Sequence, residues 1–319
     1  MKLKLALLLS AVLGGAALAQ PPAPASAVFE AGRPLGVTLD GAYEAMSANV
    51  KVYGAAVNAE SCAYDPVRKL IVLPNRGAEQ GQIVNDGFVS LLNPDGSVHT
   101  SRWIGVNRNG LTLNQPFGAE VFNGKLYLAD RDGGTSPTDT AVSVIRMFDM
   151  ATGAPAGEIR SPESTGLNDI AVAADGTIYG SQTGAPMRIF KIAPDGRTSV
   201  FVEGPVLKQP NGVALDNDGN VVVLNMGGDE ILTFSKDGKL AKTERAAMSG
   251  NDGIVIMKDG TKYVSSVQRG GVTRLRPGRP AELIARGVPS AASMCFDPDA
   301  NQLVIPMNAN NAVALIKLD

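Results

Sequence analysis

The chain has 319 residues, with 29 basic and 31 acidic side chains and a formal net charge of −2. The sequence has no basic run, so the electrostatic signature of a nucleic-acid-binding protein is missing. It contains a single histidine, His99, which excludes metal sites built from several imidazoles. Because His99 lies in a turn and strand pattern typical of a half-exposed outer strand, Ser-His-Asp hydrolysis is not expected either. Any catalysis must then use carboxylates, amides, hydroxyls or a bound cation.

The N-terminus is typical of a secretory signal peptide. Two lysines precede an apolar run from Leu5, which ends at the small-residue triplet Ala17-Leu18-Ala19. We expect residues 1–19 to be a signal peptide, residues 20–35 to be a Pro/Ala-rich tether, and residues 36–319 to form the folded domain. No later stretch reaches the ~20 consecutive apolar residues that a membrane-spanning helix requires. The predicted location is the periplasm or the cell exterior.

Six segments then repeat one pattern: a polar or small residue, a β-type run, an Asp-Gly-like turn and a second apolar strand. They are residues 60–74, 117–130, 168–181, 211–225, 252–266 and 292–307. Weaker outer hairpins lie between them, for example around Asp95-Gly96 and Asp195-Gly196. Four strands per unit at a period of about 40 to 55 residues are typical of propeller blades. We therefore predict an all-β fold, a six-bladed β-propeller with four antiparallel strands per blade.

The sixth unit is one strand short, because only residues 312–318 follow its inner hairpin. Residues 49–53, ahead of the first unit, have strand character and no partner there. Closed β architectures hide their strand edges. We therefore expect the segment between about residues 36 and 54 to supply the outer strand of the last blade.

Oxygen-bearing side chains recur at one register of this repeat. The same position ahead of the turn is occupied in the six units by Glu60, Phe117, Asn168, Asn211, Asp252 and Ala292. The innermost strands of a propeller begin around one channel mouth, so this register would gather the polar side chains in a ring. Carboxylate and amide oxygens suit a hard divalent cation, calcium first and magnesium second. The alternative is that Asn and Asp favour the turn before a strand for backbone reasons.

The same positions carry a resemblance to the SMP-30/gluconolactonase family of six-bladed, calcium-dependent lactone hydrolases. The matching motifs are Ala59-Glu60-Ser61-Cys62-Ala63-Tyr64-Asp65-Pro66, Leu167-Asn168-Asp169, Gln209-Pro210-Asn211-Gly212 and Asn251-Asp252-Gly253. The resemblance extends over most of the chain with the order of the blades intact. It implies that Glu60, Asn211 and Asp252 bind the metal, and that Asn168 binds substrate next to it.

One departure from the family pattern concerns specificity. Members that act on sugar lactones commonly have an arginine where this chain has Gly166. Arg76 and Arg131 follow the second strands of the first two units, and we expect their loops, residues 76–81 and 131–136, to overhang the same mouth as a lid. Either arginine could bind substrate in place of the missing one; the alternative for each is a solvated loop position.

The resemblance implies an exported metal-dependent hydrolase that opens a lactone or related ester. A cation at the site would polarise the carbonyl, and Asp252 is the candidate catalytic base. The alternative is a non-catalytic periplasmic propeller that binds a small molecule or a protein at the same mouth, because one fold can host unrelated functions. A quinone-dependent sugar dehydrogenase is disfavoured, because its usual histidine base has no counterpart.

The two cysteines, Cys62 and Cys295, fall in the inner strands of the first and sixth units, which are neighbours in a closed ring. An exported protein can keep a disulfide. A bridge needs a Cα separation of about 5.5 Å, and inner strands of adjacent blades can lie farther apart. The sequence leaves open a disulfide or two buried thiols.

Overall fold

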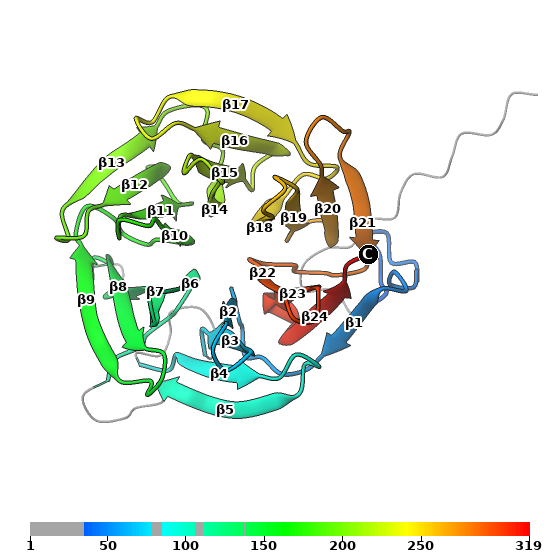
Figure 1. Cartoon of the computed structure of the whole chain (residues 1–319), viewed down its shortest axis with the longest axis horizontal. Coiled ribbons are helices and arrows are strands. Elements are labelled where there is room, and N and C mark those ends of the chain that lie inside the picture. Colours follow the sequence, from blue (N-terminus) through cyan, green and yellow to red (C-terminus); the bar gives the residue numbers. More distant parts are fainter. Residues whose placement is uncertain (1–34, 78–84, 106–110, 135, 137) are drawn as a thin grey trace, which may run out of the picture.

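The computed structural model describes residues 35–77, 85–105, 111–134, 136 and 138–319. The predicted signal peptide, nearly all of the predicted tether and part of the predicted lid lie outside these residues. The described chain forms six four-stranded antiparallel sheets, arranged as blades around a central axis (Figure 1). The predicted six-bladed β-propeller is therefore confirmed. None of the described residues forms a helix long and apolar enough to cross a membrane.

The first five blades each consist of four consecutive strands, from the channel outward. Blade 1 comprises β2 (Ala63–Asp65), β3 (Leu70–Asn75), β4 (Phe88–Leu92) and β5 (Val98–Gly105). Blade 2 comprises β6 (Ala119–Phe122), β7 (Lys125–Asp132), β8 (Val142–Asp149) and β9 (Pro155–Ser161). Blade 3 comprises β10 (Ile170–Val172), β11 (Ile178–Gln182), β12 (Arg188–Ile192) and β13 (Thr198–Glu203). Blade 4 comprises β14 (Pro210–Leu215), β15 (Val221–Asn225), β16 (Glu230–Phe234) and β17 (Leu240–Arg245). Blade 5 comprises β18 (Asn251–Ile256), β19 (Lys262–Ser266), β20 (Gly271–Leu275) and β21 (Glu282–Arg286).

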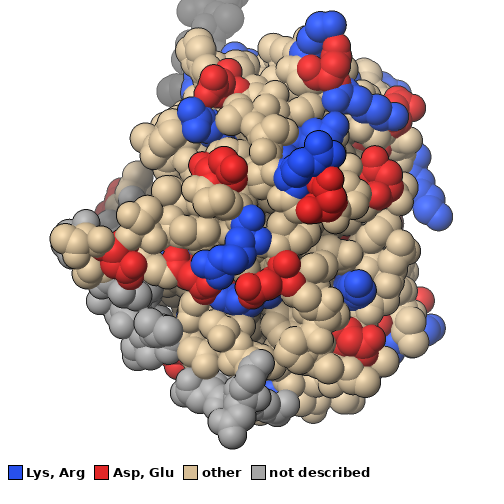
Figure 2. Space-filling view, turned by 90° about the vertical axis from the view of Figure 1, so that its left-hand side faces the viewer, with Lys and Arg blue, Asp and Glu red and all other residues tan. Residues whose placement is uncertain are grey.

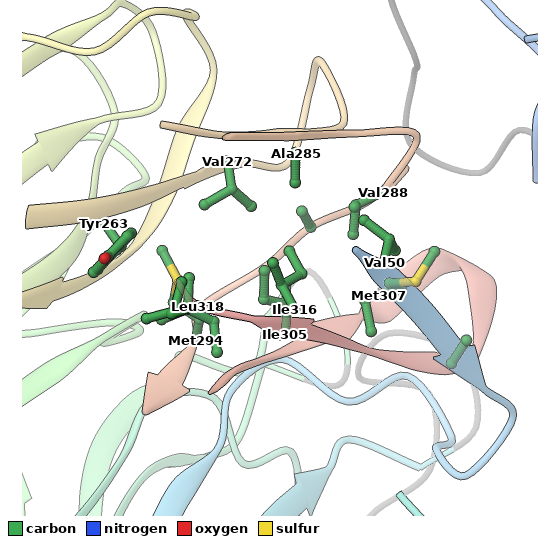
Figure 3. Close-up of a cluster of buried hydrophobic side chains, with 14 residues drawn as sticks. Val50, Tyr263, Val272, Ala285, Val288, Met294, Ile305, Met307, Ile316 and Leu318 are labelled. Carbon is green, nitrogen blue, oxygen red and sulfur yellow. The ribbon is translucent and has the colours of Figure 1, made fainter. Parts of the chain in front are cut away.

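Blade 6 combines the two ends of the propeller. Three strands come from the C-terminal segment, β22 (Cys295–Asp297), β23 (Gln302–Met307) and β24 (Ala312–Lys317), and β1 (Val50–Tyr53) forms the outer edge. β1 runs antiparallel to β24, with Val50 opposite Ile316. Both side chains are buried in one apolar cluster between blades 5 and 6 (Figure 3). The prediction that an N-terminal strand closes the last blade is confirmed.

Burial explains why the inner hairpins are the clearest signal in the sequence. The second strands lie between neighbours within the blade and between adjacent blades, so every residue of β3, β11 and β15 is buried. Outer strands face solvent, and β17 is almost entirely exposed. Blade 3 shows why an Asp-Gly turn suits an inner hairpin: Gly176 has a φ of +85°, and the Asp175 carboxylate accepts the Thr177 N–H at 2.9 Å.

The flank of the ring around β9 and β13 carries basic and acidic side chains interspersed (Figure 2). Several of them pair across neighbouring strands, such as Arg188 with Glu203 at 3.0 Å and Arg146 with Glu158 at 2.8 Å. This flank therefore has no large surface of a single sign.

A disulfide joins Cys62 to Cys295, with a Cα separation of 5.5 Å. It links the innermost strand of blade 6 to the segment that enters the innermost strand of blade 1. The sequence left open whether Cys62 and Cys295 form a bridge or remain thiols, and the structure shows a bridge. The ring is closed twice, by the β1–β24 ladder at its outer edge and by this bond near its channel.

Candidate metal and substrate site

The predicted metal ligands lie at the starts of innermost strands, as the repeat requires. Asn211 and Asp252 are the second residues of β14 and β18, and Glu60 lies just ahead of β2. Asn168 occupies the corresponding position ahead of β10. All four lie where the innermost strand of their blade begins, and these strands surround the central channel (Figure 1).

Backbone hydrogen bonds show that these positions share one register. The Asn168 N–H donates to the carbonyl of Ser181 in β11 at 2.7 Å. Phe117 donates in the same way to Ala129 in β7 at 2.8 Å, and the Ala292 N–H donates to Pro306 in β23 at 2.9 Å. Equivalent residues of different blades are therefore held by equivalent ladder contacts.

Close approach of neighbouring inner strands explains the glycine that follows two of the ligands. A Cβ at Gly212 would lie 2.1 Å from the carbonyl oxygen of Asp252, and a Cβ at Gly253 would lie 2.5 Å from the Met294 nitrogen. Neither glycine has positive φ, so lack of space is the reason for glycine at both positions. The Asn-Gly motif thus brings the ligand-bearing strands of blades 4 and 5 together, and the Asp-Gly motif brings that of blade 5 close to the inner segment of blade 6.

Asn211 and Asp252 form the centre of the site. The Asn211 amide Nδ2 donates to Asp252 Oδ2 at 3.0 Å, and both residues are 2% exposed. The remaining oxygen of each, Asn211 Oδ1 and Asp252 Oδ1, is buried without a hydrogen-bond partner among the described residues. Buried polar atoms are nearly always hydrogen-bonded, so two such oxygens in contacting residues require an explanation. Their chemistry fits a hard divalent cation.

Glu60 approaches the pair from blade 1. Its Oε2 accepts a hydrogen bond from Asn308 Nδ2 at 2.7 Å and forms an ion pair with Arg76 Nη1 at 3.3 Å. The Arg76 guanidinium also stacks 4.1 Å from the centre of the Phe117 ring. Arg76, which the sequence assigns to the rim of the mouth, therefore contacts a predicted metal ligand directly.

The electrostatics of the site disfavour two bare carboxylates. Burial raises the pKa of Asp252 well above its usual range, and the nearby charges of Glu60 and Asp169 raise it further, against the hydrogen bond from Asn211. A divalent cation would relieve this repulsion. No group of three or more His, Cys, Asp or Glu side chains gathers into a metal-binding cluster within the part of the chain that the structure describes. A cation here would therefore depend on two carboxylates and an amide oxygen.

Two further acids lie in the channel, and sequence reasoning did not single them out. Burial raises the pKa of Asp169 to about 7, although its Oδ2 accepts the Val213 N–H at 2.9 Å. Burial, and then the charge of Asp169, raise the pKa of Glu120 to about 8. Both line a cavity of about 240 Å³ along the inner strands. Asp169 belongs to the Leu167-Asn168-Asp169 motif, which assigned it no role, and the position of Glu120 in an inner hairpin is the signal that could have indicated it.

A second cavity, of about 260 Å³, opens beside Asn168. Its wall includes Phe117 and Leu167, and Arg131 from β7 lines it on the side of blade 2. Thr183, another lining residue, donates its hydroxyl to the carbonyl of Pro210 at 2.7 Å, one residue before Asn211. One lining residue of the cavity is therefore bonded to the residue next to Asn211. The structure brings Asn211 and Asp252 into contact, with Glu60 close enough for its charge to act on Asp252, and it places Asn168 with Arg131 at this neighbouring cavity.

His99 lies away from these groups. It is exposed on β5, the outermost strand of blade 1, and its Nδ1 contacts Thr100 Oγ1 at 2.9 Å. The prediction of an outer-strand histidine is confirmed.

The chain matches no protein-family model and no curated protein. Solved structures with a similar fold include a gluconolactonase from Xanthomonas campestris, 20% identical, with a TM-score of 0.58 over 94% of this chain and 99% of that one. A putative gluconolactonase is 17% identical, with a TM-score of 0.56 over 85% and 93% of the two chains. A catalytically inactive virginiamycin B lyase from Staphylococcus aureus, in which alanine replaces a histidine, was crystallised with quinupristin; it is 13% identical, with a TM-score of 0.58 over 85% and 100%.

At these identities the similarity shows the fold alone. The propeller class is therefore established, and the neighbours include gluconolactonase-like proteins and a lyase. A fold shared by proteins with different activities does not choose between them. The activity of this protein must therefore be argued from the side chains at the channel mouth.

Proposed function

We propose that this protein is an exported, metal-dependent hydrolase that opens a lactone or related ester, with calcium as the first candidate ion. The observation that carries the proposal is the pair of buried oxygens without partners, Asn211 Oδ1 and Asp252 Oδ1. They belong to contacting side chains at the position where the family resemblance expects metal ligands. Magnesium is the second candidate, because it also prefers oxygen ligands but demands a more regular octahedral geometry.

Glu60, Asn211 and Asp252 would hold the ion. When bound, a divalent cation polarises a carbonyl and stabilises the negative charge that develops on its oxygen. Asp252 is the candidate base that would accept the proton of the attacking water, and burial keeps this carboxylate away from bulk solvent. Asn168, at the neighbouring cavity, would orient the substrate through its amide.

Arg76 and Arg131 are the proposed substrate-binding cations at this mouth. Arg76 is held in place by the ion pair with Glu60 and the Phe117 ring. Arg131 lines the cavity that contains Asn168. Gly166 lines the same cavity as Arg131, and Arg76 is close enough for its charge to act on Arg131.

One observation supports export, and another favours a hydrolase over a histidine-dependent lyase. The Cys62–Cys295 disulfide is of the kind that persists in oxidising compartments, as expected for a periplasmic or secreted protein. The lyase neighbour is inactive when a histidine is replaced by alanine. The only histidine of this chain lies on an outer strand, so it is not available to act at the mouth.

The test is turnover of a panel of γ- and δ-lactones and aryl esters by the purified protein, before and after chelator treatment and after return of calcium. We expect hydrolysis that is lost with the chelator and restored by calcium. The Asn168→Ala variant should bind calcium with unchanged affinity and turn over substrate more slowly. Tight binding of a panel compound without any turnover would instead identify a small-molecule-binding propeller, the alternative left by the sequence.

A further inference from the structure

Arg131 is a half-buried cation without a counter-ion. Its guanidinium has no hydrogen-bond or ion-pair partner among the described residues. Burial lowers its pKa, and the neighbouring positive charge of Arg76 lowers it further, with Asp130 acting in the opposite direction. Leaving an arginine partly desolvated and unpaired has a free-energy cost, which a bound anion would offset.

The carboxylate whose charge acts on Arg131, that of Asp130, already has hydrogen-bond partners. Asp130 Oδ1 accepts the Gln115 N–H at 2.6 Å, and Oδ2 accepts the Asn114 N–H at 3.0 Å and Nε of Arg146 at 2.6 Å. This carboxylate secures the segment that leads into the inner strand of blade 2. It therefore does not neutralise Arg131 through a direct contact.

The cavity next to Arg131 has room for a ligand group. A Cβ at Gly166 or at Gly184 would meet nothing within 4 Å, so the wall is open at both positions. Phe117 and Leu167 supply apolar surface on the wall. The volume of about 260 Å³ suits a short substituent rather than a polymer. The wall also carries polar side chains, among them Asn168 and the hydrogen-bonded Asp130. A cavity that presents one unpaired guanidinium is suited to a small carboxylate, which the planar guanidinium can bind through two parallel hydrogen bonds.

From this arrangement we propose that the substrate carries a carboxylate in addition to the carbonyl that reacts, and that Arg131 binds this carboxylate in the cavity beside Asn168. The inference rests on the proposed function for the identity of the reacting group. Arg131 would thus determine specificity: it favours acidic lactones or esters over neutral ones of the same shape. Gly166 then contributes to the same specificity, because its lack of a side chain leaves the space that the carboxylate-bearing group would occupy.

The test uses paraconate, a γ-butyrolactone with one carboxylate, and its neutral carboxamide. Both are titrated calorimetrically into the calcium-loaded protein. The preference for paraconate is the ratio of the two dissociation constants if neither compound is turned over. It is the ratio of the two kcat/KM values if both are turned over. The variants are Arg131→Gln, which removes the charge, and Arg131→Lys, which keeps it. Arg197→Gln is the control, because Arg197 lies on the exposed outer part of blade 3 and pairs with Asp195.

We expect the wild-type protein to prefer paraconate by about tenfold or more, as one charge-assisted hydrogen-bonded pair would provide. Arg131→Gln should abolish the preference with calcium affinity unchanged, Arg131→Lys should retain part of it, and Arg197→Gln should leave it intact. Absence of a preference in the wild type, binding of neither probe, or a preference that survives Arg131→Gln would overturn the inference. Absence of turnover together with a preference that depends on Arg131 would refute the hydrolase and leave the carboxylate site standing.

Discussion

Removing the Cys62–Cys295 disulfide should cost this propeller a large part of its stability. The bond closes a loop with a sequence separation of 233 residues. Applied to that length, the chain-entropy relation gives an upper estimate of about 5.5 kcal/mol at 25 °C, and measured disulfides typically contribute about 2–4 kcal/mol. Closure of the ring by β1 does not reduce this value, because the noncovalent ladder is lost on unfolding whereas the disulfide still restricts the unfolded chain.

The site of the bond adds a packing contribution. Cys62 and Cys295 are buried in one cluster with Ile71, Leu73 and Val304. A Cys62→Ala/Cys295→Ala double variant loses two sulfur atoms there as well as the cross-link. We therefore expect its free energy of unfolding to fall by about 3–5 kcal/mol.

Urea denaturation of the oxidised wild type and of the double variant measures this difference. The denaturant dependence should become steeper in the variant, because an uncross-linked unfolded chain exposes more surface. Reductant should lower the stability of the wild type towards that of the variant and leave the variant unchanged. A variant within about 1 kcal/mol of the oxidised wild type would contradict this expectation, because the cross-link would then contribute less than the usual range.

Three further predictions concern ring closure, strand packing and the channel. Deleting residues 49–53 should expose the β24 edge and lower the melting temperature by about 10 °C or more, and an unchanged value would show that the ladder is dispensable. Gly212→Ala should cost about 1–3 kcal/mol and weaken calcium binding, because the added methyl would meet the Asp252 carbonyl, whereas Gly54→Ala, with open space around it, is the control. Because the pKa of Glu120 is raised from 4.5 to about 8 in the folded state, this group should make the calcium-free protein less stable as pH rises through this window. Its own contribution is at most about 1.4 kcal/mol per pH unit, in addition to that of Asp169. Glu120→Gln should flatten the dependence in thermal denaturation from about pH 5 to pH 8, and an unchanged slope would contradict the assignment.

The blades could be predicted because their signals are local. The Asp-Gly turns and the buried second strands repeat along the chain, so each inner hairpin can be recognised by itself. The role of β1 followed from counting strands, since an unpaired edge in the sixth unit required a partner from elsewhere. The common register of Asn168 and Asn211 followed from the same alignment, because equivalent positions in a closed ring face one axis.

The features that could not be predicted from the sequence depend on contacts between blades. Asn308, which donates to Glu60, lies 248 residues away from it in the chain. The raised pKa of Asp169 arises from burial by neighbouring inner strands, which no motif encodes. The disulfide depended on a distance between adjacent blades that the spacing of Cys62 and Cys295 does not fix.

The most direct test of the proposed metal site is calorimetric titration of the chelator-treated protein with calcium. Glu60→Gln and Asp252→Asn each remove one negative charge and keep the shape of the side chain, and Asp195→Asn removes an exposed carboxylate on the outer part of blade 3 as a control. We expect one bound ion per wild-type chain, an affinity lower by about tenfold or more in each site variant, and no change in the control. Wild-type affinity in both site variants, or no calcium binding by the wild type, would rule out the proposed metal site.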